Sequence, residues 1–174
     1  MLAIVVVQRL AELAFAHRNT KRLIAEGATE AGARHYPLVV ALHAAWIVAI
    51  AVFVPADSPA NVPLLVAFFA LQGARLWVIA SLGRFWTTRI ITLPGAPLVR
   101  DGPYRFFRHP NYVVVAVEIP LLPLAFGAEG IALGFGLANL VLLWHRIRVE
   151  NAALAGRFNT SGTSRGCAPD RPSG

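Results

Sequence analysis

Long apolar segments constrain this chain more than any other feature of its sequence. Residues 35–54 and 62–82 are each about twenty residues long, enough helix to cross a ~30 Å hydrocarbon core at about 1.5 Å per residue. Residues 112–126 and 131–144 are shorter, and the brief turn between them predicts a helical hairpin. Residues 1–16 have a helical pattern and are a fifth candidate. The sequence therefore predicts an all-α integral membrane protein with about five transmembrane helices.

The Lys and Arg residues lie on alternate connections between these segments. The connections 55–61 and 127–130 contain neither residue type, whereas the remaining connections and the C-terminal segment hold fourteen of the sixteen. Such one-sided clustering marks the cytoplasmic face of a membrane protein. It requires five crossings, with the N-terminus outside and the C-terminus in the cytoplasm. The residues on this face are Arg18, Lys21, Arg22, Arg34, Arg84, Arg89, Arg100, Arg105, Arg108, Arg146, Arg148, Arg157, Arg165 and Arg171.

The composition excludes several classes of protein. Only 14% of the residues are charged and 56% are hydrophobic, whereas a soluble domain carries about 25% charged residues. The net charge of +7 does not indicate nucleic-acid binding, because the basic residues flank apolar spans and leave no basic soluble surface. The single cysteine excludes an internal disulfide, and we expect no metal site. We expect one domain over residues 1–158 and a disordered, Ser/Gly/Pro-rich tail over residues 159–174.

Five ionisable residues fall inside the predicted spans, where an unpaired charge is costly. Arg9 and Glu12 are three residues apart and can form an intrahelical pair. For His43 we favour a neutral ring bonded to a neighbouring helix. Arg75 either reaches the cytoplasmic face or pairs with Glu118 or Glu12, because its charge cannot be lost. Glu118 is either a structural partner of such a pair or part of a pocket wall.

Two sets of reactive side chains lie on the predicted cytoplasmic side. The run GPYRFFRHPNY over residues 102–112 begins with a Gly-Pro turn and places His109 and Pro110 at the start of the next helix. A helix N-terminus favours anionic or carboxylate-bearing ligands, although the same run also suits a membrane-interface anchor. After the last span, Arg146 and Glu150 are four residues apart on a predicted helix and share a face. They form either a surface ion pair or the second half of one site.

Together, these two sets resemble the isoprenylcysteine carboxyl methyltransferase family of integral membrane enzymes. The shared pattern is Gly-x-Tyr-x-x-x-Arg-His-Pro-x-Tyr before a hairpin and an Arg and a Glu after it. Pieces such as QRLAEL (residues 8–13) and WTTRI (residues 86–90) look like a bacterial branch that O-methylates alkylresorcinols and alkylpyrones made by polyketide synthases. The resemblance covers about residues 5–154.

The resemblance implies S-adenosylmethionine as the cofactor and a lipid-like acceptor that enters from the bilayer. It implies cofactor contacts for Tyr104, His109, Pro110, Tyr112 and Glu150. By the same resemblance Arg108 orients the nucleophilic oxygen as the catalytic residue, and Arg146 braces Glu150 within the cofactor site. Such a reaction needs no metal, and a lipid-producing polyketide synthase is a possible partner.

Two other interpretations stay open at this point. Membrane sterol-type double-bond reductases, which use NADPH, share a similar Arg-His-Pro-x-Tyr element, but they are usually longer. A non-catalytic membrane homologue is the second alternative. Binding of S-adenosylmethionine or of NADPH distinguishes these interpretations.

Overall fold

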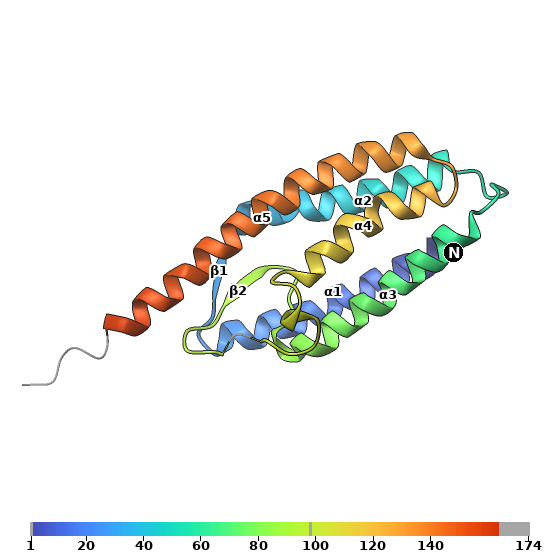
Figure 1. The fold of residues 1–174 in the computed structure, drawn as a ribbon. Helices are drawn as coiled ribbons and strands as arrows, with labels where there is room; N and C mark the ends of the chain where they lie inside the picture. Colours follow the sequence, from blue (N-terminus) through green and yellow to red (C-terminus); the bar gives the residue numbers. More distant parts are fainter. Residues whose placement is uncertain (1, 98, 164–174) are drawn as a thin grey trace, which may run out of the picture.

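The fold is a bundle of five α-helices that run lengthwise beside one another (Figure 1). The computed structural model describes residues 2–97 and 99–163, with residues 155–163 described by their backbone alone. The helices are α1 (Leu2–Ala25), α2 (Tyr36–Phe53), α3 (Val62–Leu82), α4 (Pro110–Leu124) and α5 (Glu129–Thr163). The predicted all-α class is confirmed; two short strands are added to it, β1 (Thr29–Ala31) and β2 (Ile90–Thr92).

The connections rich in basic residues all lie at one end of the bundle. There β1 pairs antiparallel with β2, so the α1–α2 connection is joined to the long α3–α4 connection. Two ion pairs add to this link, Arg84 with Glu26 at 2.8 Å and Arg89 with Glu30 at 2.9 Å. The N-terminus and the α2–α3 and α4–α5 connections lie at the opposite end (Figure 1). The structure shows five alternating helices; that all five cross a membrane, with the N-terminus outside, stays a prediction.

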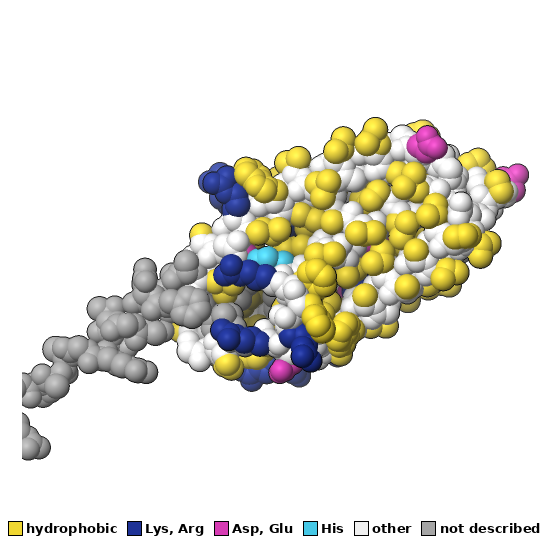
Figure 2. Space-filling model, in the orientation of Figure 1, with side chains coloured by type: hydrophobic (Ala, Val, Ile, Leu, Met, Phe, Trp, Pro, Cys, Tyr) yellow, Lys and Arg dark blue, Asp and Glu magenta, His cyan; other side chains and the backbone are white. Residues whose placement is uncertain are grey.

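Three segments are long and apolar enough to cross a membrane, namely Ala33–Phe53, Val62–Phe85 and Glu129–Leu154. Helix α4 is shorter, and α1 carries charged residues along its length. Hydrophobic side chains cover the helical surface in Figure 2, whereas Lys and Arg gather toward the end that holds the long connection. Large apolar side chains are exposed on this surface, among them Phe53 (73% exposed) and Val52 (66% exposed). Lipid is the environment that such a surface requires.

Helix α5 is longer than the sequence predicts. The predicted span 131–144 and the predicted helix after it are one continuous helix from Glu129 to Thr163. The break in apolar pattern near Arg146 therefore marks where the helix leaves the apolar part of the bundle, not where it ends. The helix also includes residues 159–163 of the predicted disordered tail, and residues 164–174 lie outside the described residues.

Helix α4 contains two internal prolines, Pro120 and Pro123. A proline has no N–H to donate to the carbonyl four residues earlier, so Pro123 leaves the carbonyl of Ile119 without its helical partner. The fully buried Trp46 replaces that donor, with its indole Nε1 at 2.9 Å from the Ile119 oxygen. This bond ties α2 to α4 at the centre of the apolar core.

The charged residues inside the spans form one buried network. Glu118, which has no exposed surface, accepts hydrogen bonds from Arg9, Arg75 and Gln72. Arg9 also pairs with Glu12 at 2.7 Å, and Arg75 lies 3.5 Å from the same carboxylate. The predicted Arg9–Glu12 pair and the pairing of Arg75 are confirmed. Of the two roles considered for Glu118, the structure supports that of a structural partner.

Candidate functional site at the basic end of the bundle

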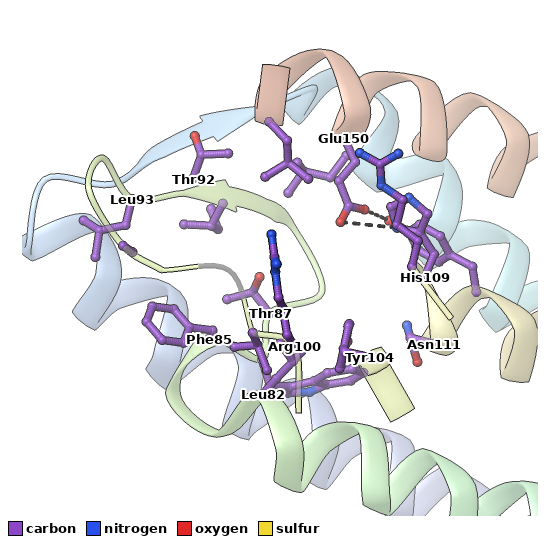
Figure 3. A pocket seen from close by; sticks show the side chains of 18 of the residues that line it. Leu82, Phe85, Thr87, Thr92, Leu93, Arg100, Tyr104, His109, Asn111 and Glu150 are labelled. Atoms are coloured by element: carbon purple, nitrogen blue, oxygen red, sulfur yellow. Dashed lines mark hydrogen bonds and ion pairs between the residues drawn. The ribbon is translucent and has the colours of Figure 1, made fainter. Parts of the chain in front are cut away.

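A cavity of about 840 Å³ lies between the α3–α4 connection and the part of α5 that follows the apolar span. We call it the loop cavity. Side chains from β2, from the 3-10 helix Gly102–Arg105, from the start of α4 and from α5 reach into it (Figure 3). The sequence-predicted residues that line it are Tyr104, Arg108, His109, Tyr112, Arg146 and Glu150.

The Gly-Pro turn at the start of the motif is fixed by close packing. Gly102 has a φ of 59°, and a Cβ atom at this position would lie 2.3 Å from the Ser81 hydroxyl oxygen of α3. Only glycine fits both the left-handed backbone and this approach. Pro103 is buried directly after it. The turn therefore holds the motif against α3 and positions Tyr104 in the cavity wall.

His109 and Pro110 begin α4 as the sequence predicts, with His109 at the N-cap and Pro110 at the first helical position. The two residues differ in their relation to the cavity. His109 lines the cavity, whereas Pro110 is buried and is not among the lining residues. The expected cofactor contact of Pro110 therefore stays a prediction, whereas its ring starts the helix, for which its fixed φ suits it.

Glu150 is held by the aromatic residues at the start of α4. The Tyr112 hydroxyl donates to Glu150 Oε2 at 2.5 Å, and His109 Nδ1 lies 3.7 Å from Oε1. His109 and Tyr112 stack, with ring centroids 5.4 Å apart. Asn151, which follows Glu150, has its Oδ1 at 3.3 Å from His109 Nε2. The two motifs predicted from the sequence are thus joined into one site by direct contacts.

Arg146 does not brace Glu150 directly. In the described part of the chain these two side chains form no ion pair, although they are one helical turn apart. Arg146 Nη2 instead donates to the backbone oxygen of Thr88 at 2.9 Å, and its guanidinium lies 5.8 Å from the Tyr112 ring centroid. Tyr112 already donates to Glu150, and the backbone of the α3–α4 connection provides an acceptor for Arg146. Arg146 therefore supports Glu150 through Tyr112.

The charges around the loop cavity are unequal. Glu150 is the one carboxylate among its lining residues, and five arginines line it, including Arg100 and the exposed Arg108. In Figure 3 the Arg100 side chain points into the cavity on the side of Glu150. Burial, and then the charge of Glu150, raise the pKa of the Tyr104 hydroxyl, so Tyr104 acts as a neutral group. The described residues contain no cluster of His, Cys, Asp or Glu that could hold a metal.

A second cavity of about 280 Å³ lies deeper, between α1, α2 and α5, and we call it the membrane cavity. Its walls are mostly apolar, with side chains such as Leu13, Val40 and Ile47. His43 lines it too, but its Nδ1 bonds to the Val39 oxygen of its own helix at 2.8 Å and not to a neighbouring helix as expected. Four residues line both cavities, which therefore adjoin there: Trp86, Asn111, Tyr112 and Arg146.

Several residues that line the membrane cavity contain buried polar atoms without a hydrogen-bond partner. Among the described residues, five buried side-chain nitrogen or oxygen atoms lack a hydrogen bond, and all five belong to residues that line this cavity. Three of them lie in the wall shared with the loop cavity. Buried polar groups normally have partners, so these five atoms, each with almost no accessible surface, are exceptions that belong to residues around this cavity. The five atoms are Arg9 Nε, Arg75 Nε, Trp86 Nε1, Asn111 Oδ1 and Arg146 Nε.

Trp86 and Asn111 are site residues that sequence reasoning missed. Asn111 stands inside the Arg-His-Pro-Asn-Tyr run, so its position next to Pro110 could have indicated it. Trp86 lies in the connection that follows α3, and no spacing relates it to the motif. Its place in the shared wall depends on the way that the connection folds back over α5.

Comparison with known proteins identifies the family of this chain. The model of the isoprenylcysteine carboxyl methyltransferase (ICMT) family matches residues 64–156. The protein YpbQ of Bacillus subtilis (strain 168) is 39% identical over 158 residues, covering 88% of this chain and 94% of YpbQ. An uncharacterized protein of Haemophilus influenzae is 29% identical over 165 residues, covering 91% of this chain and 95% of that protein. No solved structure matches the chain. The chain belongs to the isoprenylcysteine carboxyl methyltransferase family, and it is an integral membrane methyltransferase.

Proposed function

We propose that this protein transfers a methyl group from S-adenosylmethionine to an oxygen of a lipid-like acceptor. One observation carries the proposal: a loop cavity with charged walls and an apolar membrane cavity adjoin at four residues that hold three buried, unpartnered polar atoms. A water-soluble cofactor and a lipid-soluble acceptor need such a pair of compartments. Methyl transfer from a sulfonium to an oxygen needs the two reactants in line, so positioning supplies much of the rate gain.

The loop cavity has the groups that the cofactor requires. S-adenosylmethionine supplies an electrophilic methyl group, and it also carries an ammonium, a carboxylate and two ribose hydroxyls. Glu150, held by Tyr112 at 2.5 Å, can accept hydrogen bonds from the ammonium or from the hydroxyls. The cavity arginines, with Arg100 on the side of Glu150, suit the carboxylate. Tyr104 and His109 complete this wall.

The shared wall suits the oxygen that accepts the methyl group. Trp86 Nε1 and Arg146 Nε are unpartnered donors, and Asn111 Oδ1 is an unpartnered acceptor. Donors beside a phenolic or enolic oxygen favour the oxyanion, which is the better nucleophile. Arg108 lines only the loop cavity, from where it orients the reacting oxygen in this proposal. The proton of the acceptor hydroxyl leaves toward the solvent-facing loop cavity.

The acceptor that we propose is an amphipathic compound with a phenolic, enolic or carboxylate oxygen, of which alkylresorcinols and alkylpyrones are examples. Apolar side chains of α1 and α2 line the membrane cavity, so an alkyl chain can extend from it toward the bilayer. We place the loop cavity on the cytoplasmic side, because the Lys and Arg residues cluster there, and the N-terminus outside. A lipid-producing polyketide synthase is the partner that such a substrate suggests.

Ligand-dependent melting tests the cofactor assignment directly. The full chain in detergent is heated with S-adenosylmethionine, with S-adenosylhomocysteine and with NADPH. A ligand at a hundred times its dissociation constant stabilises the folded state by about 2.7 kcal/mol. We expect both sulfur compounds to raise the melting temperature and NADPH to leave it unchanged. A shift with NADPH alone favours a reductase, and no shift with any of the three favours a non-catalytic homologue.

A matched pair of variants assigns the binding to the loop cavity. Glu150→Ala removes the cavity carboxylate and is expected to abolish the shift with S-adenosylhomocysteine. Glu129→Ala makes the same change at the exposed first residue of the same helix, at the opposite end of the bundle, and is expected to keep the shift. Equal shifts in both variants would remove Glu150 from the cofactor site.

A further inference from the structure

Arginine side chains lie over aromatic rings at five places in the described part of the chain. All five are toward the basic end of the bundle, where the connections rich in Lys and Arg lie. A guanidinium that is attracted to the face of a ring still has N–H donors for a second partner. The nature of that second partner divides the five pairs into two groups. The pairs are Arg84 with Phe85, Arg89 with Tyr36, Arg105 with Phe106, Arg146 with Tyr112 and Arg148 with Trp144.

Three of these arginines have their second partner within the protein. Two form ion pairs with glutamates, and the third donates to a backbone oxygen. The rings of these three pairs are half-buried, so these pairs belong to the packing of the fold. The partners are Glu26 for Arg84 at 2.8 Å, Glu30 for Arg89 at 2.9 Å and the Thr88 oxygen for Arg146 at 2.9 Å.

Arg105 and Arg148 form the second group, because the ring is their only partner. Among the described residues neither guanidinium forms an ion pair or a hydrogen bond. Their rings are also the exposed ones, with Phe106 66% exposed and Trp144 60% exposed. An exposed ring is stabilised by contact with lipid, and a cation without a counter-charge is stabilised by anionic groups nearby. These two pairs therefore face surroundings that are apolar and anionic together.

The pair on α5 is oriented like the interface of a bilayer. Trp144 precedes Arg148 by four residues, or about 6 Å along the helix axis. Since α5 runs toward the basic end, the ring lies on the side of the apolar span and the guanidinium, 4.7 Å from the ring centroid, on the side of the connections. Tryptophan is favoured where acyl chains end, and the lipid phosphates follow at the next level outward.

The second pair is held on a fixed turn of the chain. The backbone N–H groups of Phe106 and Phe107 donate to the Pro103 oxygen at 3.2 and 3.1 Å. Phe107 is 56% exposed, and Trp77 of α3, 51% exposed, lies close to Gly102 at the start of the turn. Exposed aromatic rings thus gather at this place in a conformation that the backbone sets. Figure 2 shows Lys and Arg side chains beside hydrophobic ones at this end of the bundle.

We propose that each of these two pairs binds the headgroup of an anionic phospholipid. The guanidinium donates to the phosphate oxygens, and the ring lies against the first carbons of the acyl chains. A phosphatidylcholine headgroup suits the pairs less well, because its own ammonium group balances the phosphate and repels the arginine. Arg105 and Phe106 also line the loop cavity, so one headgroup lies at the edge of that cavity. The inference goes beyond the proposed function and needs neither cofactor nor methyl transfer.

Quenching of tryptophan emission by brominated lipids tests the pair on α5. The full chain with Trp77→Phe is placed in phosphatidylcholine nanodiscs, where Trp144 is then the one exposed tryptophan, since Trp46 and Trp86 are buried. Increasing shares of the lipid are replaced by brominated phosphatidylglycerol or by brominated phosphatidylcholine. We expect half-maximal quenching at an about fivefold smaller share of the phosphatidylglycerol, the effect of one arginine close to anionic lipid. Equal shares would overturn the proposal.

Two glutamine variants assign this preference to the pair. Arg148→Gln keeps much of the side-chain length without the charge, and the fivefold ratio is expected to fall to about one. Arg84→Gln is the matched control: this exposed arginine also lies over a ring at the same end, but it is paired with Glu26, and the ratio should stay near five. An unchanged curve with brominated phosphatidylcholine shows that Trp144 keeps its exposure. Equal losses in both variants would mean that general positive charge attracts the lipid, and would overturn the proposal.

The second pair is tested with the reporter moved to its ring. Phe106→Trp, combined with Trp77→Phe and Trp144→Phe, places the one exposed tryptophan beside Arg105. We again expect an about fivefold preference for brominated phosphatidylglycerol. Arg105→Gln should remove this preference, whereas Arg148→Gln should leave it unchanged at this reporter. A preference that survives Arg105→Gln would refute the headgroup site at this pair.

Discussion

Replacing Glu118 by glutamine should destabilise the fold far more than its small chemical change suggests. Glu118 is fully buried and accepts hydrogen bonds from Arg9 and Arg75 as well as from Gln72 at 3.0 Å. Glutamine keeps the shape but removes one of the two negative charges that balance the two arginines. It also presents an amide NH2 to a guanidinium donor, so one side of the group loses its hydrogen bonds.

The expected size follows from the cost of leaving a buried charge without its partner, about 3–5 kcal/mol. In a chain of this length, 1 kcal/mol lowers the melting temperature by roughly 2–4 °C, so we expect a decrease of about 6–20 °C. Melting of the purified protein in detergent, followed by tryptophan emission, measures it. Glu129→Gln, an exposed position at the end of the bundle, is the matched control and should change stability by less than about 0.5 kcal/mol.

A second variant separates charge from shape. Glu118→Gln combined with Arg75→Gln restores a neutral network, so the double variant should be less unstable than the sum of the two single variants. Additive losses would mean that the two side chains do not compensate one another. A melting temperature of Glu118→Gln within about 1 °C of the unaltered protein would refute the reasoning, because the network would then carry no net stabilisation.

Three further predictions concern the loop cavity. Tyr112→Phe removes the 2.5 Å bond that holds Glu150 and should raise the dissociation constant of S-adenosylhomocysteine about tenfold in calorimetry; an unchanged constant would contradict this role. Arg108→Ala should keep that affinity but reduce methyl transfer at least about a hundredfold, and full activity would show that Arg108 does not orient the acceptor oxygen. Burial raises the pKa of Tyr104 above its ordinary 10.0, so the folded state holds this proton more tightly than the unfolded state. Its contribution to stability is complete below pH 10.0 and decreases above it, so melting temperatures should decrease more steeply there for the unaltered protein than for Tyr104→Phe; parallel curves would contradict the raised pKa.

The spans and the motif positions were predictable because their signals are local. A stretch of apolar residues must be covered by lipid or by other helices, and the prolines and glycines of residues 94–110 interrupt any continuous helix there. Pro110 predicts the start of α4, because the fixed φ of proline suits the first position of a helix. The pairing of Arg75 with Glu118 was also among the expectations, because a buried arginine must find a carboxylate.

The remaining features depend on contacts that the spacing of residues along the sequence does not predict. Arg146 bonds to the backbone oxygen of Thr88, and any residue at position 88 would offer that oxygen. The bond from Trp46 to Ile119 arises because Pro123 frees a carbonyl on another helix. The length of α5 was underestimated, because the apolar pattern ends where the surroundings change while the backbone remains helical.

The family match and the two cavities divide the chain in a similar way. Residues 64–156 hold nearly the whole lining of the loop cavity, with Leu23 as the exception, whereas α1 and α2 lie outside the match and form much of the membrane cavity. Under our proposal the matched part supplies cofactor binding and α1 and α2 select the acceptor. YpbQ aligns over 88% of this chain, more than residues 64–156 alone, so the alignment reaches into these helices. Exchanging residues 2–53 between the two proteins should therefore move acceptor preference with the exchanged helices and leave cofactor affinity with residues 64–156. Cofactor affinity that followed the exchanged helices would refute this division.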